Sequence, residues 1–468
     1  MTRVALQIGR QTGNHASTAV SIERLVNGYV ERAPTGKVPE PVIGCPGGVL
    51  FATCGSGPIR AMVEQSDTLY VVSGDEFYSV DSGGNETLIG GGIPTGLVSM
   101  DVGFDADEFA VVIEAAGQIW AFDGTTLTTN TDADALPASG VAATDSLFVF
   151  GGLDTTQVFS SELNDPLNYD ALDFASAEWK PDYIVTPIEQ GGTLYAFGTR
   201  TVQAFYYDAG AGFPYSAYKD LKLDVGLAGK RAVCATNETL FFLAHDGSIR
   251  RLDGATATPI QTPAIHRIIM GDAANGLAGW SDLSQTVASA HVWQGHLFIV
   301  FNNPDGCVVF DQTTQLWHER QSYGLDSWRL AQHADAFGYV LYGDTENGKV
   351  YRLASDAYDE DGEILPFEIV TPFAWAGNLR GCVDQLETVF ETGVCDISLS
   401  PVVTMERTRD GRTWSPAQER SLGAQGDYTT RVRWGVQGQG RCMAWRFRIT
   451  DACKRACLSV YADVEIER

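Results

Sequence analysis

Positive charge is scarce in this sequence. Lys and Arg number 32 against 59 Asp and Glu, which gives a formal net charge of -27 at pH 7. The shortage is uneven, because residues 366–468 hold 13 basic and 13 acidic residues and the whole negative balance therefore lies before residue 366. A strongly acidic surface repels phosphate backbones, so the first part of the chain is not expected to grip nucleic acid.

Long apolar runs are missing as well. No stretch of 18 apolar residues occurs, so we expect no membrane span. The first residues, MTRVALQIGRQTGNHASTAV, lack the continuous apolar core of a secretory signal, and we expect the protein to fold in a cytoplasm. A hydrophobic content of 44% excludes a disordered chain, and 468 residues allow two or three domains.

The nine cysteines form no recognisable framework. Their number is odd and no Cys-x-x-Cys occurs, so neither a disulfide scaffold nor a zinc site is indicated. We interpret them as small buried apolar residues in a reduced compartment.

Catalytic signatures are absent too. The sequence has no His-Glu-x-x-His, no Gly-x-Ser-x-Gly and no phosphate-binding loop, since Gly36-Lys37-Val38 lacks the hydroxyl that would hold magnesium. The seven His residues show no ligand spacing, and we interpret His291 and His296 as structural. The sequence thus predicts no catalytic residue, no metal site and no cofactor.

What the chain does contain is glycine, 50 residues of it, and a repeated hairpin. Each repeat has a short alternating strand, a Gly or Asp turn and a second alternating strand. The repeats begin at Thr68, Glu108, Ser146, Thr193, Thr239, His296 and Gly338. A spacing of roughly 40 to 55 residues is typical of propeller blades, in which each sheet buries its apolar face against the next. We predict seven blades, or six if one hairpin belongs to an insertion, with a core of alternating aromatics such as Tyr70, Trp120, Phe122, Tyr195, Phe241 and Tyr351.

The central stretch from Val158 to Tyr215 has an unusual order of features. An Asp165-Pro166 turn leads into Tyr169-Asp170-Ala171-Leu172-Asp173-Phe174, then Glu178 and Pro181-Asp182, then a hairpin and the corner Phe213-Pro214-Tyr215. Before the repeats, residues 1–60 carry Asn27-x-Tyr29-x-Glu31, Pro46-Gly47 and Gly57-Pro58-Ile59-Arg60. The Pro and Gly density of this segment favours an extended arm that lies on another surface.

Together these motifs resemble the packaged-DNA stabilisation or tail nozzle (tail hub) proteins of short-tailed bacteriophages (podoviruses). The resemblance covers most of residues 20–350. It implies a structural virion protein of the tail, assembled in the bacterial host cytoplasm, that forms a ring, with six copies expected, below the portal. Its implied partners are further copies of itself, the head-to-tail adaptor, a tail fibre or tip protein, and double-stranded DNA that passes through the channel without sequence-specific binding. An acidic wall that does not bind phosphate suits such a conduit.

After residue 364 the pattern changes to longer alternating strands, which predict a C-terminal β-sandwich or jelly roll. We therefore expect an arm and lead-in strand over 1–60, a propeller over 61–364 and a sandwich over 365–468. The acidic run 358–363 reads as an exposed linker, in which Asp359 and Asp361 have the spacing to share a weakly bound cation.

The sandwich contains the candidate interface. Arg431 and Arg433, and Arg446 and Arg448, alternate along two strands, so each pair faces one side while Trp434 and Trp445 face the other. A solvated strand face is one interpretation, and a subunit or partner interface is the other, because Arg and Trp are enriched at interface cores. Nucleic-acid binding by these arginines is a third. The resemblance adds Asn27, Tyr29 and Glu31 of the arm to the predicted interface.

Two alternatives to a phage tail protein remain open. Thr408-Arg409-Asp410-Gly411-Arg412-Thr413-Trp414 resembles the Asp box of sialidases, which would fit a propeller glycosidase, although Asp boxes staple turns and this one lies outside the propeller. A propeller scaffold that binds peptides is the other alternative. Ring assembly would distinguish the tail protein from both.

Overall fold

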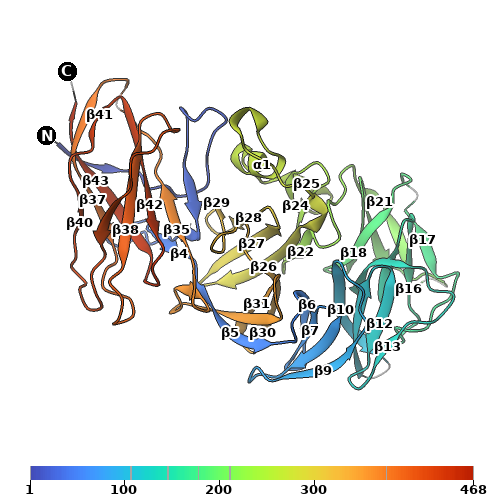
Figure 1. Cartoon of the computed structure of the whole chain (residues 1–468). Coiled ribbons are helices and arrows are strands. Elements are labelled where there is room, and N and C mark those ends of the chain that lie inside the picture. Colours follow the sequence, from blue (N-terminus) through green and yellow to red (C-terminus); the bar gives the residue numbers. More distant parts are fainter. Residues whose placement is uncertain are drawn as a thin grey trace.

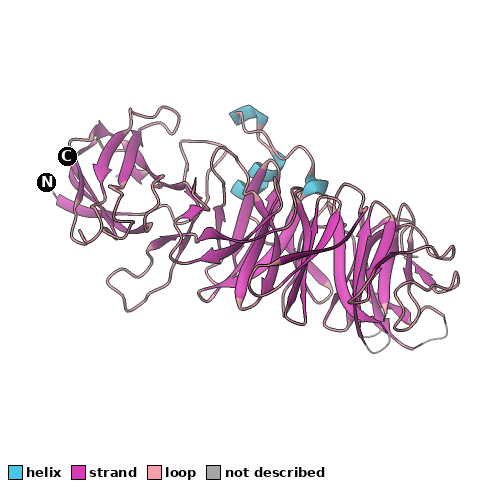
Figure 2. Cartoon of the chain, turned by 60° about the horizontal axis from the view of Figure 1, so that its bottom comes forward, coloured by secondary structure: helices cyan, strands magenta, loops and turns pink. Residues whose placement is uncertain are grey.

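The computed structural model describes residues 2–105, 108–144, 147–177, 179–209, 212–375 and 377–466. Nearly all its elements are strands, with a propeller at one end of the molecule and a sandwich, which holds both termini, at the other (Figure 1, Figure 2). The prediction of an all-β propeller with a C-terminal sandwich is confirmed. Ser146 and Glu178, which belong to the predicted repeat and the central stretch, lie outside the described residues.

Six blades of the propeller are built from four consecutive antiparallel strands each. In chain order they are β6 (Ile59–Gln65), β7 (Thr68–Ser73), β8 (Glu76–Val80) and β9 (Glu86–Gly91); β10 (Val98–Asp105), β11 (Glu108–Ala115), β12 (Gln118–Phe122) and β13 (Leu127–Thr129); β14 (Ala138–Ala143), β15 (Phe148–Gly152), β16 (Gln157–Ser160) and β17 (Phe174–Ser176); β18 (Ile184–Gln190), β19 (Thr193–Gly198), β20 (Val202–Tyr207) and β21 (Tyr215–Leu223); β22 (Val233–Ala235), β23 (Leu240–Leu243), β24 (Ile249–Asp253) and β25 (Thr256–Pro259); β26 (Val287–Trp293), β27 (His296–Asn303), β28 (Gly306–Asp311) and β29 (Leu316–Glu319).

A seventh blade is assembled from both ends of the propeller sequence. It combines β30 (Leu330–Ala336), β31 (Tyr339–Asp344) and β32 (Lys349–Ala354) with β5 (Gly47–Thr53), which pairs antiparallel with β32. Each of the seven predicted hairpins supplies the second and third strands of one blade. Between the fifth and sixth blades lie α1 (Pro263–Met270) and the short 3-10 helices η1 (Ala273–Asn275) and η2 (Leu283–Gln285).

The predicted aromatic positions form the cores between blades. Tyr70 and Phe77 of the first blade pack with Trp120 and Phe122 of the second, and the rings of Tyr70 and Phe122 lie 5.6 Å apart. Because every blade has such an apolar face, a blade alone would leave it exposed and the ring must close to bury it.

The sandwich draws strands from both ends of the chain. One sheet contains β1 (Thr2–Leu6), β3 (Gly28–Val30), β4 (Val42–Gly44), β37 (Gly381–Phe390), β40 (Val432–Trp434), β41 (Gly438–Gly440) and β43 (Ala456–Ile466). The facing strands are β2 (Arg24–Val26), β35 (Phe367–Val370), β36 (Ala374–Trp375), β38 (Val402–Thr408), β39 (Gln418–Ser421) and β42 (Cys442–Ile449).

The N-terminal segment is therefore not a separate arm. Its apolar residues Leu25, Val26, Val30 and Val42 are buried in this chain's own core, and β5 closes the propeller although it precedes residue 60. The expectation that the arm over residues 1–60 lies on another surface is wrong for residues 24–53, because β2, β4 and β5 pair with β35, β43 and β32 of the same chain.

Cysteine follows the predicted pattern. All nine thiols are free, and seven are buried, while Cys382 is exposed and Cys442 is half-buried. None of the described helices has the length and hydropathy that a membrane crossing requires.

Candidate functional site

One continuous sheet connects the propeller to the sandwich. The sixth blade ends at β29, β2 pairs in parallel with it through Val26 and Glu319, and β2 also pairs antiparallel with β35 of the sandwich. The chain thus inserts a strand from its N-terminal segment between its two domains. We call the residues around β2, the end of β29 and the start of β35 the junction.

Asn27 ties the two domains together at the junction. Its side-chain Nδ2 donates to the carbonyl oxygens of Gln321 at 2.8 Å and of Pro366 at 2.6 Å, and its Oδ1 accepts from the Gln321 amide at 3.1 Å. The residue is fully buried with φ 52°, a left-handed conformation that Asn tolerates better than most residues. These contacts are all intramolecular.

Tyr29 and Glu31 continue the same role. Tyr29 is buried, its hydroxyl donates to Gln294 Oε1 at 3.2 Å, and its ring packs edge-on against His296 and Phe298 of the sixth blade. Glu31 Oε2 lies 3.4 Å from His296 Nε2. The predicted motif therefore clamps the N-terminal segment to the sixth blade.

Arg24 is the charged centre of the junction. Its guanidinium contacts Glu319 through Nη2 at 2.6 Å and Nε at 2.9 Å, and reaches Glu368 through Nη1 at 3.4 Å. Burial by itself would lower the pKa of Arg24, but the Glu319 carboxylate holds that pKa above its ordinary value. None of these three residues was predicted from the sequence. The only local signal was a carboxylate, Glu368, in an otherwise apolar strand.

The arginines of β42 extend this network across the sandwich. Arg448 pairs with Glu368 and lies 3.4 Å from Glu406, and Arg446 contacts the same Glu406 at 2.6 Å. Carboxylates and guanidinium groups thus alternate along one face of the continuous sheet, from Glu319 to Arg446. Arg446 and Arg448 have partners within the chain, although the Arg448 side chain remains 43% exposed.

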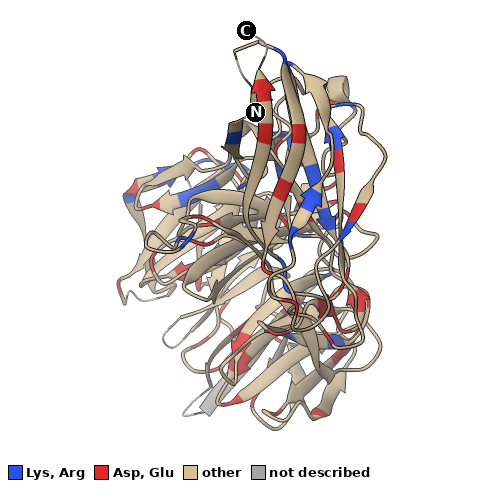
Figure 3. Ribbon diagram, turned by 90° about the vertical axis from the view of Figure 1, so that its left-hand side faces the viewer, with Lys and Arg blue, Asp and Glu red and all other residues tan. Residues whose placement is uncertain are grey.

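The opposite outer face of the sandwich carries a second arginine cluster around one carboxylate. Arg431 contacts Glu387 in a bidentate manner, at 2.7 and 2.8 Å, and Arg3 reaches the same carboxylate at 2.7 Å. Arg433 lies 3.7 Å from it. The hydrogen bond from Arg431 lowers the pKa of Glu387. Three guanidinium groups share one carboxylate, and acidic and basic residues are interspersed on the sandwich (Figure 3).

The predicted alternation of Arg and Trp is correct, but the tryptophans are not surface residues. Trp434 and Trp445 are fully buried between the two sheets, and Trp434 Nε1 donates to Thr388. Asn27 and Tyr29 are buried as well. These four cannot contact a neighbouring subunit while the chain stays folded. The two arginine pairs belong to different sheets and face opposite sides of the sandwich.

The propeller axis is crossed by two basic side chains. Lys230, just before the fifth blade, lies 2.8 Å from the buried Glu114 of the second blade. Arg231 beside it donates to Gln332 of the seventh blade at 3.1 Å. Because these blades are not neighbours in the ring, both contacts span its interior. The propeller axis is thus occupied by protein.

The remaining predicted features are structural. Asp361 pairs with Lys349 at 3.0 Å, and Glu360 is buried and accepts from Trp328 Nε1, so the run 358–363 belongs to the propeller and is not a free linker. Among the described residues, no group of three or more His, Cys, Asp or Glu is placed to hold a metal ion. Asp410 of the Asp box accepts from the amides of Arg412 and Thr413 at 2.8 Å, which staples the turn.

Histidines buried near the junction respond to pH in two directions. Burial lowers the pKa of His318 to about 3 and holds that of His291 well below the ordinary 6.5. His296 moves the other way, because its hydrogen bond to Asp311 raises its pKa. The neutral His291 and His318 therefore stabilise the fold above about pH 6.5, and that contribution is lost on acidification. The contribution of His296 to stability is present below pH 6.5 and is lost as the pH rises through its raised pKa.

Acidification is expected to destabilise the protein mainly through the two neutral histidines. Each of these histidines takes up a proton when the chain unfolds below its unfolded pKa, so each shifts the unfolding equilibrium by roughly tenfold per pH unit in that range. His318→Gln should remove part of this dependence, which urea unfolding at several pH values would measure. The same substitution at the exposed His15, His15→Gln, controls for the change of residue type. An unaltered pH profile in His318→Gln would contradict this assignment.

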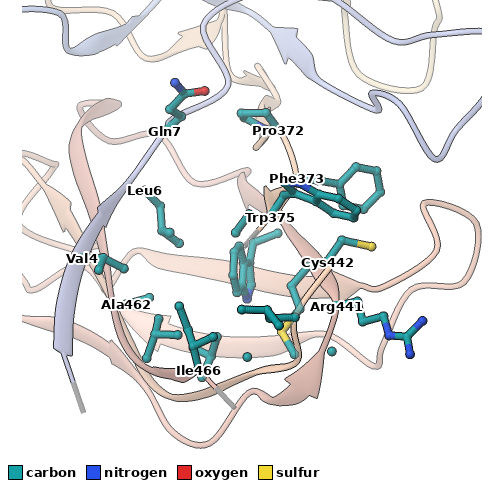
Figure 4. A pocket seen from close by; sticks show the side chains of 18 of the residues that line it. Val4, Leu6, Gln7, Pro372, Phe373, Trp375, Arg441, Cys442, Ala462 and Ile466 are labelled. Carbon is teal, nitrogen blue, oxygen red and sulfur yellow. The ribbon is translucent and has the colours of Figure 1, made fainter. Parts of the chain in front are cut away.

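A cavity lies at the free end of the sandwich. It has a volume of about 710 Å³ and opens between the edge strands β1 and β36. Figure 4 shows Val4 and Leu6 on one side, Phe373 and Trp375 on the other, and Ala462 and Ile466 at the base. We call it the end pocket. Its lining is mostly apolar.

A closed propeller is joined to a sandwich by a continuous sheet and by ion pairs, which defines an all-β protein of two modules. The sequence matches two family models in the same order, "Bacteriophage P22 Gp10, beta-propeller" over residues 25–358 and "Bacteriophage P22 Gp10, beta-sandwich" over residues 366–465. The chain belongs to this family of phage structural proteins, which stabilise packaged DNA in the virion tail. Membership implies a place in the tail and assembly with other virion proteins.

No curated protein matches the sequence. Similar solved structures include a streptogramin B lyase, at 12% identity and a TM-score of 0.44, over 65% of this chain and 96% of that one. Virginiamycin B lyase from Staphylococcus aureus is similar at 12% identity and a TM-score of 0.42, over 64% of this chain and 94% of that one. Similarities this weak carry no conclusion for this chain. The match to a family of structural proteins argues against the glycosidase alternative.

Proposed function

We propose that this protein is the nozzle subunit of a short-tailed phage, which forms a ring, with six copies expected, below the portal and adaptor. The ring extends the DNA channel, retains packaged DNA and docks tail fibres or a tip protein. The observation that carries this proposal is the match of both family models, in order, over nearly the whole chain.

Three features of the molecule support the proposal. The junction makes propeller and sandwich one stiff unit, which suits a wall that must resist the pressure of packaged DNA. The contacts of Lys230 and Arg231 fill the propeller axis, so DNA would pass between subunits and not through a propeller. Net negative charge before residue 366 keeps such a wall from binding phosphate.

The proposal is tested by adding the purified protein to particles that lack it. We expect a ring at the tail vertex, visible by electron microscopy, and restored retention of DNA, measured by resistance of the genome to nuclease. A protein that never joins the particle would refute the proposal. A monomer in free solution decides nothing, because such a ring can require the adaptor as a template.

The arginine face around Glu387 is proposed to dock another tail protein. Arg433→Glu should weaken docking by about tenfold, because it removes electrostatic attraction to the partner. The fold should persist, because the Arg433 side chain is 42% exposed and its 3.7 Å contact with Glu387 is too long for a hydrogen bond. Arg431 is less suitable, since its bidentate contact also stabilises the sandwich. Binding to tail complexes that lack the protein, measured by sedimentation, checks this.

A matched control is Arg412→Glu, which makes the same charge change on an exposed turn away from Glu387. Equal binding of the two variants would contradict the assignment of the Glu387 face. Among the predicted interface residues, Arg431 and Arg433 are exposed and Glu31, Arg446 and Arg448 are partly exposed, so these five remain candidates for contact with a partner. The buried Asn27, Tyr29, Trp434 and Trp445 are not candidates.

A further inference from the structure

The end pocket leaves part of the sandwich core uncovered. Trp375 is 63% exposed, Ile466 46% and Val4 36%, although all three line the cavity between the two sheets (Figure 4). Within the described residues, the flanking strands β1 and β36 each pair on one side, with β43 and β42 respectively. Large apolar side chains that remain exposed around a concavity mark a site for an apolar partner group.

The rim of the end pocket is basic. Arg441 lines it, Arg380 lies between the lining residues Leu379 and Gly381, and the Arg409 carbonyl accepts from Cys442 Sγ at the same edge. All three arginines are exposed. Glu465 is the acidic residue among those that line the pocket. An occupant that combines an apolar group with carboxylates would match both the lining and the rim.

The propeller presents such a group at the opposite end of the molecule. The loop 161–173 contains Glu162, Asp165, Asp170 and Asp173 and no Lys or Arg. Leu172 at its tip is 77% exposed. The loop leads into β17, at the end of the propeller farthest from the sandwich (Figure 1).

This loop is ordered by its own contacts. The Leu172 amide donates to Asp170 Oδ1 at 2.9 Å, and the Asp173 amide donates to the Asp170 carbonyl at 2.9 Å, which forms a tight turn beneath Leu172. Tyr169 is buried, and its hydroxyl donates to the Pro166 carbonyl at 2.6 Å. A preorganised turn loses little entropy when it binds, which favours its exposed leucine as an anchor.

We propose that the Leu172 turn of one copy inserts into the end pocket of a second copy. The occupant is therefore the same chain, and the contact joins two different surfaces at opposite ends of the molecule. Such a heterologous contact generates a ring when its rotation closes. The inference rests on the proposed ring, and it names the surfaces through which neighbouring subunits meet: Leu172 fills the apolar cavity while Asp170 and Asp173 face Arg441 and Arg380.

A pair of introduced cysteines tests the contact directly. With Val4→Cys in the pocket wall and Leu172→Cys on the turn, mild oxidation of assembled tails should link neighbours into a ladder from dimer to closed ring, seen on non-reducing gels. Each single variant and the native chain, with its exposed Cys382, set the background. The matched control pairs Val4→Cys with Leu163→Cys, since Leu163 is 61% exposed in the same loop but away from the turn tip.

A charge test complements the crosslink. Leu172→Asp, or Arg441→Glu, should lower incorporation into tails by about tenfold while leaving thermal unfolding unchanged, and Arg441→Glu combined with Asp173→Arg should recover part of the loss. If the native chain joins tails but the cysteine pair forms no ladder beyond its controls, or if Leu172→Asp assembles normally, this inference is overturned and the proposed function stands. If the native chain never joins tails, the proposed function itself has failed.

Discussion

Replacing Arg24 by alanine is expected to lower the free energy of unfolding by about 2–4 kcal/mol, because it leaves the buried Glu319 carboxylate without a counter-charge and leaves Glu368 with Arg448 alone. Glu319 is 10% exposed and Glu368 9%, so neither can recover its hydration in the folded state. The value lies below that of a completely buried pair because the Arg24 side chain is 34% exposed. Urea unfolding followed by circular dichroism measures the change.

Two further variants separate the causes. Arg448→Ala removes a guanidinium from the same network, but its side chain is 43% exposed, so the loss should stay within about 1 kcal/mol. Combining Arg24→Met with Glu319→Gln and Glu368→Gln removes all three charges and should recover most of the stability. Equal losses of unfolding free energy for Arg24→Ala and Arg448→Ala would show that the burial of charge does not determine the stability of the junction.

Local periodicity explains why the propeller could be predicted from the sequence. Each hairpin lies within about twenty residues, its turn requires Gly or Asp-Gly, and its apolar side chains alternate, so pattern and structure agree blade by blade. The same alternation correctly separated Arg431 and Arg433 from Trp434. These features are set by neighbours in sequence.

The junction could not be predicted in this way. Arg24 meets Glu319 and Glu368 across 295 and 344 residues, and no period in the chain indicates such a pairing. The Pro and Gly density of residues 1–60 correctly indicated extended chain, but extended chain pairs equally well with another subunit or with its own sheet. Only the tertiary structure distinguishes these two pairings. In it, the predicted interface residues Asn27 and Tyr29 are buried and connect the N-terminal segment to the rest of the chain.

The strand β5, which closes the propeller, is expected to be essential for folding. Deletion of residues 1–53 removes the fourth strand of the seventh blade and the strand β2 that bridges the domains, and we expect the shortened chain to lose cooperative unfolding and to aggregate. Deletion of residues 1–6 removes only β1, whose residues are mostly exposed, and should leave the fold intact while opening the end pocket. Thermal unfolding and limited proteolysis compare the two.

Two adjacent glycines of β5 allow a matched test in the full-length chain. A Cβ on Gly47 would lie 2.2 Å from the Asp359 carbonyl oxygen, which is backbone and cannot rotate away. The nearest atom to a Cβ on Gly48 is Tyr351 Cβ at 3.4 Å, an ordinary contact. Gly47→Ala should therefore destabilise the protein by about 1–3 kcal/mol and Gly48→Ala much less. Similar stabilities for the two variants, or a cooperative fold after deletion of residues 1–53, would mean that the propeller closes without β5. If β5 is required, closure of the propeller depends on a strand that is synthesised first. That strand can pair only after β32 has been synthesised.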